Sequence, residues 1–210
     1  MFRKTVLAAA TLAMSASAAS AHHPLGGETP NNFVDGLLSG IGHPVIDVDH
    51  LAFVIAVGIA ATFTSRSLLM PLVFVVATMA GTLVHLGSID LPLVEVVIAA
   101  SVAVLGALLL SGRSVPAAVF ATVFAFAGLF HGHAYGEAVF GAETTPVIAY
   151  LLGFGTVQWA IAVGAGRLLG RESRLASGMT HATARLSGAM VAGAGVLLLS
   201  DHALALIGLG

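Results

Sequence analysis

Long apolar runs, separated by short polar breaks, follow one another along most of this chain. A helix that crosses a bilayer needs about 20 mostly apolar residues. Six runs approach or reach that length, at about residues 44–63, 67–87, 91–111, 115–131, 145–166 and 186–206. Only 9% of the residues are charged, against about 25% in an average soluble domain. The sequence therefore predicts an all-α polytopic membrane protein built as a six-helix transmembrane bundle.

Prolines near the beginning of the runs support these boundaries, because a proline in the first turn of a helix forfeits no hydrogen bond. Five prolines occupy such places: Pro44, Pro71, Pro92, Pro116 and Pro146. The segment 30–40, PNNFVDGLLSG, has apolar residues at helical spacing. We expect it to form a short helix on the outer face, broken from the first span at residues 42–44.

The first 21 residues have the pattern of a cleavable export signal. Arg3 and Lys4 precede an apolar stretch too short to span a bilayer, and residues 19–21 read Ala-Ser-Ala, a small-x-small cleavage site. We expect residues 22–210 to form one transmembrane domain without a soluble domain. An uncleaved anchor helix is the alternative.

Arginines predict the orientation of the bundle. Each arginine after residue 21 lies in the break after the first, third or fifth span: Arg66, Arg113, Arg167, Arg171, Arg174 and Arg185. The breaks between the other spans contain acidic residues but no Lys or Arg. Positive residues gather in cytoplasmic loops, so the sequence predicts a multi-pass protein of the bacterial cytoplasmic (inner) membrane with both mature termini in the periplasm.

Histidines and carboxylates gather near the outer ends of the predicted spans. His43, Asp47, Asp49 and His50 open the first span, and His131, His133 and Glu137 close the fourth. Ionisable groups within a membrane are costly and mark functional sites by default. Helix capping could explain one acid at a helix start, but it does not explain two acids together with two imidazoles.

Imidazole nitrogen and carboxylate oxygen together suit borderline divalent ions such as Ni²⁺, Co²⁺ and Zn²⁺. The chain has no Cys, which excludes thiolate sites and disulfides. It has eight Lys and Arg and no phosphate-binding loop, so we expect neither a nucleic-acid partner nor ATP hydrolysis. Signal removal would also expose His22 and His23, whose nitrogens could chelate the same ions or belong to a solvated tail.

Other polar residues are weaker candidates. Glu95 is explained as an acid at a helix start, and His85, Asp201 and His202 by their place at the membrane interface. Gln158 could line a path through the bundle.

Two segments carry a resemblance to a known family. In HPVIDVDH, His43 is followed by five residues and then by Asp49-His50, and residues 130–137 read FHGHAYGE. The chain resembles the HupE/UreJ family of nickel and cobalt permeases, whose signatures are His-x5-Asp-His and Phe-His-Gly-x-Ala-His-Gly with a Glu close behind. The resemblance covers essentially the mature chain. It departs from the pattern at Tyr135, which stands at the usual second His, and at Asp47, where many members have Gly.

The resemblance implies an inner-membrane permease that is not an enzyme and holds no permanent cofactor. Its ligands for transported Ni²⁺ or Co²⁺ would be His43, Asp49, His50, His131 and Glu137, and the chemistry of Asp47 and His133 adds them to the set. The metal would supply nickel enzymes or cobalt cofactor synthesis. The partners we expect are the ion, the lipid bilayer, and further copies of the chain or other uptake subunits.

Three alternatives remain open from the sequence. A membrane cytochrome could use His50 and His131 as axial haem ligands. A metal-binding sensor would need the same residues without transport. An intramembrane metalloenzyme is a third reading, although no His-Glu-x-x-His pair is present.

Overall fold

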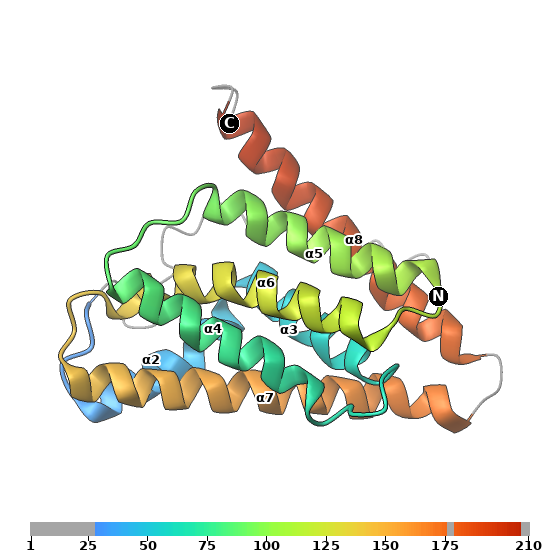
Figure 1. The fold of residues 1–210 in the computed structure, drawn as a ribbon, viewed down its shortest axis with the longest axis horizontal. Helices are drawn as coiled ribbons and strands as arrows, with labels where there is room; N and C mark the ends of the chain where they lie inside the picture. The colour runs from blue at the N-terminus through green and yellow to red at the C-terminus, as the bar shows by residue number, and fades with distance from the viewer. Residues whose placement is uncertain (1–27, 176–178, 207–210) are drawn as a thin grey trace, which may run out of the picture.

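A computed structural model describes residues 28–175 and 179–206, with side chains over 28–169 and 184–205. These residues form helices joined by short turns and loops, without a strand, which confirms the all-α class (Figure 1). The elements are α2 (Phe33–Ile46), α3 (Val48–Ala61), α4 (Met70–Leu86), α5 (Val94–Ser111), α6 (Ala117–Gly136), the 3₁₀ turn η1 (Glu137–Val139), α7 (Thr144–Leu175) and α8 (Met179–Leu206). The predicted signal peptide, with His22 and His23, lies outside the described residues.

The helices associate in pairs around α3. Helix α4 packs along α6, α5 along α8, and α2 along α7; Figure 1 shows α2 and α7 together on one side of the bundle and α5 beside α8 on the other. Helix α3 contacts α7, α5 and α8, and its Phe53, Val54 and Val57 are fully buried. His50, in the first turn of α3, is also buried, so this helix carries a histidine inside the bundle.

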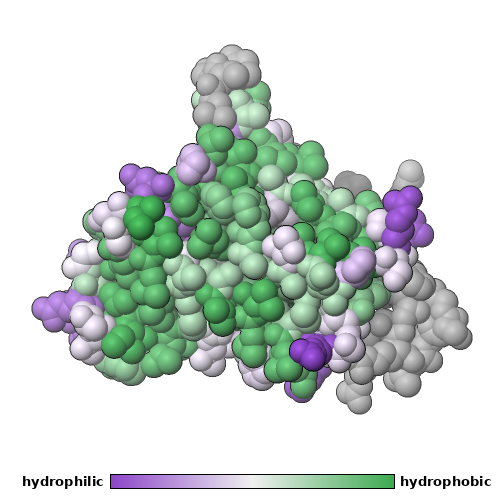
Figure 2. Space-filling view, viewed as in Figure 1, coloured by the Kyte–Doolittle hydropathy of each residue, from purple (hydrophilic) through white to green (hydrophobic). Residues whose placement is uncertain are grey.

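Within the residues that the structure describes, four helices are long and apolar enough to cross a membrane: α5, α6 with η1, α7 and α8. The bent pair α2 and α3 would make a fifth crossing if it is counted as one span, and α4 is apolar but has only 17 residues. Apolar side chains cover most of the face seen in Figure 2, and hydrophilic residues lie toward its margins. These features identify a membrane protein, with four to five spans by length and composition where the sequence predicts six.

The break before the first predicted span lies later than the sequence predicts. Helix α2 continues through Gly42, His43 and Pro44 to Ile46, and the chain bends by 81° at Asp47 before α3 begins. Pro44 removes the N–H that would bond to the carbonyl four residues back, but the helix persists for two more residues. The prediction that Pro44 starts a helix is therefore wrong; the other prolines lie at or near helix starts as expected.

Close approach between α4 and α6 depends on glycine. A Cβ at Gly132 would collide with the backbone of Thr78, and a Cβ at Gly81 would collide with the backbone of Leu129. The Thr82 hydroxyl also donates to the Gly132 carbonyl at 2.8 Å. Small residues of this kind let helices meet backbone to backbone in lipid, and here they set the position of the α6 segment that carries His131 and His133.

The two ends of α3 differ in chemistry. A cavity of about 240 Å³ lies beyond the last residue of α3, and its walls include Phe63, Arg113 and Arg185. The Arg185 Nε–H donates to the Leu110 carbonyl at 3.2 Å. At its first residues lie Asp49 and His50. A helix of 14 residues is about 21 Å long, so basic residues and the His/Asp residues occupy opposite ends of one helix.

Candidate metal centre

The bend at Asp47 gathers three metal-ligating side chains. His43 lies on α2, Asp47 in the bend and His50 in the first turn of α3, and one ligand atom from each lies within 4.8 Å of the other two. Both imidazoles are buried, and Asp47 is partly buried. We call these three residues the first site. Two buried imidazoles and a carboxylate at this separation match the donor set of a borderline divalent ion.

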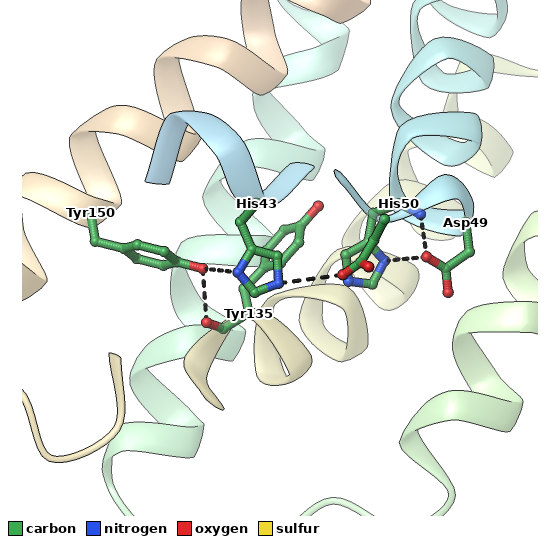
Figure 3. Close-up of polar contacts among 6 residues, drawn as sticks. His43, Asp49, His50, Tyr135 and Tyr150 are labelled. Carbon is green, nitrogen blue, oxygen red and sulfur yellow. Dashed lines mark hydrogen bonds and ion pairs between the residues drawn. The ribbon is translucent and has the colours of Figure 1, made fainter. Parts of the chain in front are cut away.

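A hydrogen-bond chain fixes the tautomer of His43 (Figure 3). The Tyr150 hydroxyl donates to the Tyr135 carbonyl at 2.9 Å, so its single proton is used there. The His43 Nδ1, which lies 2.9 Å from the same hydroxyl, must then be the donor. Its Nε2 faces the Asp47 carboxylate at 3.6 Å. A nitrogen lone pair and a carboxylate oxygen facing each other need a proton or a metal cation between them.

Asp49 orients His50. Its Oδ1 accepts the His50 backbone N–H at 2.7 Å and lies 3.2 Å from the His50 Nδ1. A carboxylate at this distance favours a proton on Nδ1, which leaves Nε2 with the lone pair that a metal requires. In this geometry Asp49 supports the imidazole from the side, while Asp47 supplies the oxygen of the first site.

His131 lies next to His50, deeper in the bundle. It is fully buried, and its ring centroid is 4.9 Å from that of His50. The Ser101 hydroxyl donates to the Ile98 carbonyl at 2.7 Å, so it accepts from the His131 Nε2, 3.0 Å away. The His131 Nδ1 then carries a lone pair, and it has no hydrogen-bond partner. Such an atom is costly to bury and is available to a cation.

The first site opens into a cavity of about 310 Å³. The walls of the cavity, which we call the first cavity, are His43, Asp47, Asp49, His50, Glu95, Ala134, Glu137 and His202. Glu95 and His202, which the sequence left as weak candidates, thus line the same space as the predicted ligands. The cavity contains four carboxylates and three imidazoles from five elements, and it can hold a hydrated cation.

Two residues of the second signature face different surroundings. The Tyr135 ring packs against both imidazoles of the first site, with centroid distances of 4.8 Å to His43 and 4.5 Å to His50. His133 instead contacts His85, with centroids 4.6 Å apart, and lines a neighbouring cavity. Position 135 therefore belongs to the surroundings of the first site, and position 133 does not.

The remaining polar candidates divide in the same way. Asp201 is exposed, whereas Gln158 is fully buried and accepts the Thr78 hydroxyl of α4 at 3.1 Å. No sequence spacing relates His202 on α8 or Glu95 on α5 to the His43 segment. The sequence signal that could have pointed to Glu95 as a site residue is the presence of an acidic residue in an otherwise apolar helix.

The chain matches a family model and a curated relative. The family model described as HupE / UreJ protein matches residues 9–198. Protein HupE of Rhizobium leguminosarum bv. viciae is 32% identical over 169 residues, which make up 79% of this chain and 85% of that protein. No solved structure matches the chain.

Proposed function

Because the chain belongs to the HupE/UreJ family, which is associated with nickel and cobalt uptake, we propose that it imports Ni²⁺ or Co²⁺ across the bacterial cytoplasmic membrane. The family is one of transporters and accessory proteins and not of enzymes. The observation that carries the proposal is the first site, where His43, Asp47 and His50 offer converging donor atoms. Zn²⁺ fits the same donors.

Uptake begins at the first cavity. Its carboxylates attract a hydrated divalent cation, and its volume leaves room for part of the hydration shell. The ion exchanges water for the imidazole nitrogens of His43 and His50 and an oxygen of Asp47. Asp49 and Tyr150 hold these imidazoles in their ligating orientation, so little ordering remains to be done when the ion arrives.

Passage inward uses the next imidazole. The His131 ring contacts that of His50, and its unpartnered Nδ1 offers a ligand deeper in the bundle. An ion that exchanges ligands from the first site to His131 moves between α3 and α6 toward the basic end of α3. Protonation of the first-site imidazoles, or a small movement of α2, would weaken the site behind it.

The topology we propose has six crossings, counting the bent pair as one and α4 as another. Seventeen helical residues extend about 26 Å, close to the ~30 Å hydrocarbon core. This arrangement places Arg66, Arg113, Arg167 and Arg185 in the cytoplasm and the first cavity in the periplasm, with a cleaved signal peptide and periplasmic mature termini. The ion, lipid and other copies of the chain or further uptake subunits remain the proposed partners.

A haem-binding role has less support from the geometry. The rings of His50 and His131 contact each other directly, so no porphyrin plane fits between them. A sensor that binds metal without moving it uses the same residues, and transport must be measured directly.

Metal accumulation tests the proposal. Metal-starved cells would express the wild type, His50→Ala or Thr122→Ala at equal membrane levels, and their nickel and cobalt contents would be measured by elemental analysis. Thr122 is an exposed residue of α6 whose hydroxyl bonds only within its own helix, so it controls for substitution itself. We expect the wild type and Thr122→Ala to raise the content of one metal, and His50→Ala to match cells without the protein. Equal accumulation with His50→Ala would refute the proposed site.

A further inference from the structure

A second pair of imidazoles lies beside the first cavity. His85 is in the last turn of α4 and His133 in the last turn of α6, and their ring centroids are 4.6 Å apart at an interplanar angle of 89°. Neither residue is among the walls of the first cavity. Both line a second cavity of about 570 Å³.

Hydrogen bonding fixes the tautomer of His133 as well. Its Nε2 lies 3.0 Å from the Ile89 carbonyl, and because a carbonyl only accepts, Nε2 is the protonated nitrogen. The His133 Nδ1 then has a lone pair without a hydrogen-bond partner, although His133 is only 5% exposed. The Nδ1 of His85 is also buried without a partner. Two neighbouring imidazoles thus each leave one buried ring nitrogen unsatisfied.

Carboxylates line the same cavity as the two imidazoles. Asp90, Glu95 and Glu137 line the second cavity together with the two imidazoles. Glu95, Glu137 and His202 line the first cavity as well, so the two cavities share part of their walls. An ion at His85 and His133 would have carboxylate oxygens nearby, and the same carboxylates would face the first site.

The helical positions separate the two imidazole groups. His131 and Tyr135 are four residues apart on α6 and share a face, whereas His133 lies two residues from each and points to another face. The first face meets His50 and His43, and the second meets His85. One helix therefore serves two groups of donors.

We propose that His85 and His133 form a second binding site for a borderline divalent cation such as Ni²⁺ or Co²⁺, with a carboxylate of Glu137 or Asp90 as further ligand. Imidazole-rich sites with carboxylate oxygen select such ions. The site rests on its own residues and does not require the first site to be occupied. Its role as a capture position that passes ions to the first site through the shared carboxylates rests on the proposed function.

Binding stoichiometry tests the proposal without transport. Full-length protein, with His22 and His23 changed to Ala in every sample so that these imidazoles add no site, would be purified in detergent and dialysed against Ni²⁺, and bound metal per chain measured by elemental analysis. We expect two ions for the wild type, one for His85→Gln with His133→Gln, one for His50→Gln, and none for all three together. The ion retained by the double variant would also show that this variant is folded.

Other outcomes separate the two sites. If the wild type and the double variant bind the same number of ions, the second site does not exist. If only the double variant loses an ion and His50→Gln loses none, the second site stands and the proposed first site fails. If the double variant does not fold, the single variant His85→Gln tests the second site instead. His85 is only half-buried at the end of α4, so we expect this variant to fold. We expect one of its two ions to bind at least tenfold more weakly than in the wild type. Unchanged affinity for both ions would overturn the proposal.

Discussion

At the scale of single residues, Tyr150 determines which nitrogen His43 offers to a cation. Its hydroxyl accepts from the His43 Nδ1 and donates to the Tyr135 carbonyl. Partners of this kind fix the tautomer of a ligating histidine, and their loss typically costs 10- to 100-fold in metal affinity. We therefore expect Tyr150→Phe to weaken Co²⁺ binding at the first site about 10- to 100-fold, measured by competition titration of the purified protein.

Tyr135→Phe is the matched control for that change. The Tyr135 ring packs on His43 and His50, and the hydrogen bond that it contributes to His43 through Tyr150 uses its backbone carbonyl, which the substitution keeps. We expect an affinity close to that of the wild type. Equal losses in both variants would show that removing either tyrosine hydroxyl near the first site lowers the affinity, and that the tautomer of His43 is not the cause.

The sequence predicted most single residues of the first site but not its full surroundings. His43, Asp47, Asp49 and His50 are near in sequence, so they stay close in space, but the 81° bend at Asp47, which the sequence did not predict, sets how they converge. Glu95 and His202 come from α5 and α8, and they line the same cavity because tertiary packing brings these helices together. In the sequence, Glu95 is explained as an acid at a helix start and His202 as a histidine at the membrane interface. Nothing in the neighbouring residues contradicts these explanations, so the sequence alone could not assign either residue to the cavity.

At the scale of elements, the contact between α4 and α6 controls the position of His131 and His133. An added methyl group at Gly132 would meet the Thr78 backbone, and overpacking of this kind costs about 1–3 kcal/mol. We expect Gly132→Ala to lower the melting temperature in detergent by several degrees, at about 2–4 °C for each kcal/mol, and to weaken metal binding.

Gly164→Ala controls for the loss of a glycine. Nothing lies within 4 Å of a Cβ at Gly164, so alanine there should be neutral or stabilise its helix by up to about 1 kcal/mol. A melting temperature that falls equally in both variants would mean that the α4–α6 contact has no special role.

Helix boundaries show where local rules stop. Pro71 and Pro116 lie at helix starts as predicted, because a first-turn proline loses nothing. Pro44 lies inside a helix and not at its start. Helix α2 packs so closely on α7 that a Cβ at Gly40 would collide with the Tyr150 backbone. We attribute the continuation of α2 past the proline to this tertiary contact. The sequence placed the break correctly within a few residues, but not at Asp47, the carboxylate of the first site.

At the scale of the whole molecule, the arginines and the first cavity lie at opposite ends of α3. The chain has no Cys, so a single introduced thiol reports its own exposure. We expect Glu143→Cys, in the exposed turn before α7, to react with a membrane-impermeant maleimide in intact spheroplasts. Ser114→Cys, exposed before α6, should react only after permeabilisation. The reverse pattern would invert the proposed topology.

The pairing of helices could not be predicted from the sequence. Hydropathy and arginine placement predict spans and their direction, since both are properties of one segment at a time. The pairing of α5 with α8 and of α2 with α7 depends on which small residues meet across helices, and glycines alone do not reveal it: Gly153 and Gly188 face neighbouring backbones, while Gly164 and Gly193 face open space.

The bend at Asp47 makes the first site sensitive to mechanical force. His43 and His50 lie on two helices that meet at 81°, and His43 lies four positions before the bend, about 6 Å along α2. A rotation of α2 by about 5° would move His43 by about 0.5 Å, more than the ~0.2 Å tolerance of a metal–ligand bond. Helix α2 also exposes Phe33, Val34, Leu38 and Ile41, apolar side chains on which lipid can press. Bilayer thickness and lateral tension, by turning α2, would therefore change the affinity of the first site for the proposed ion.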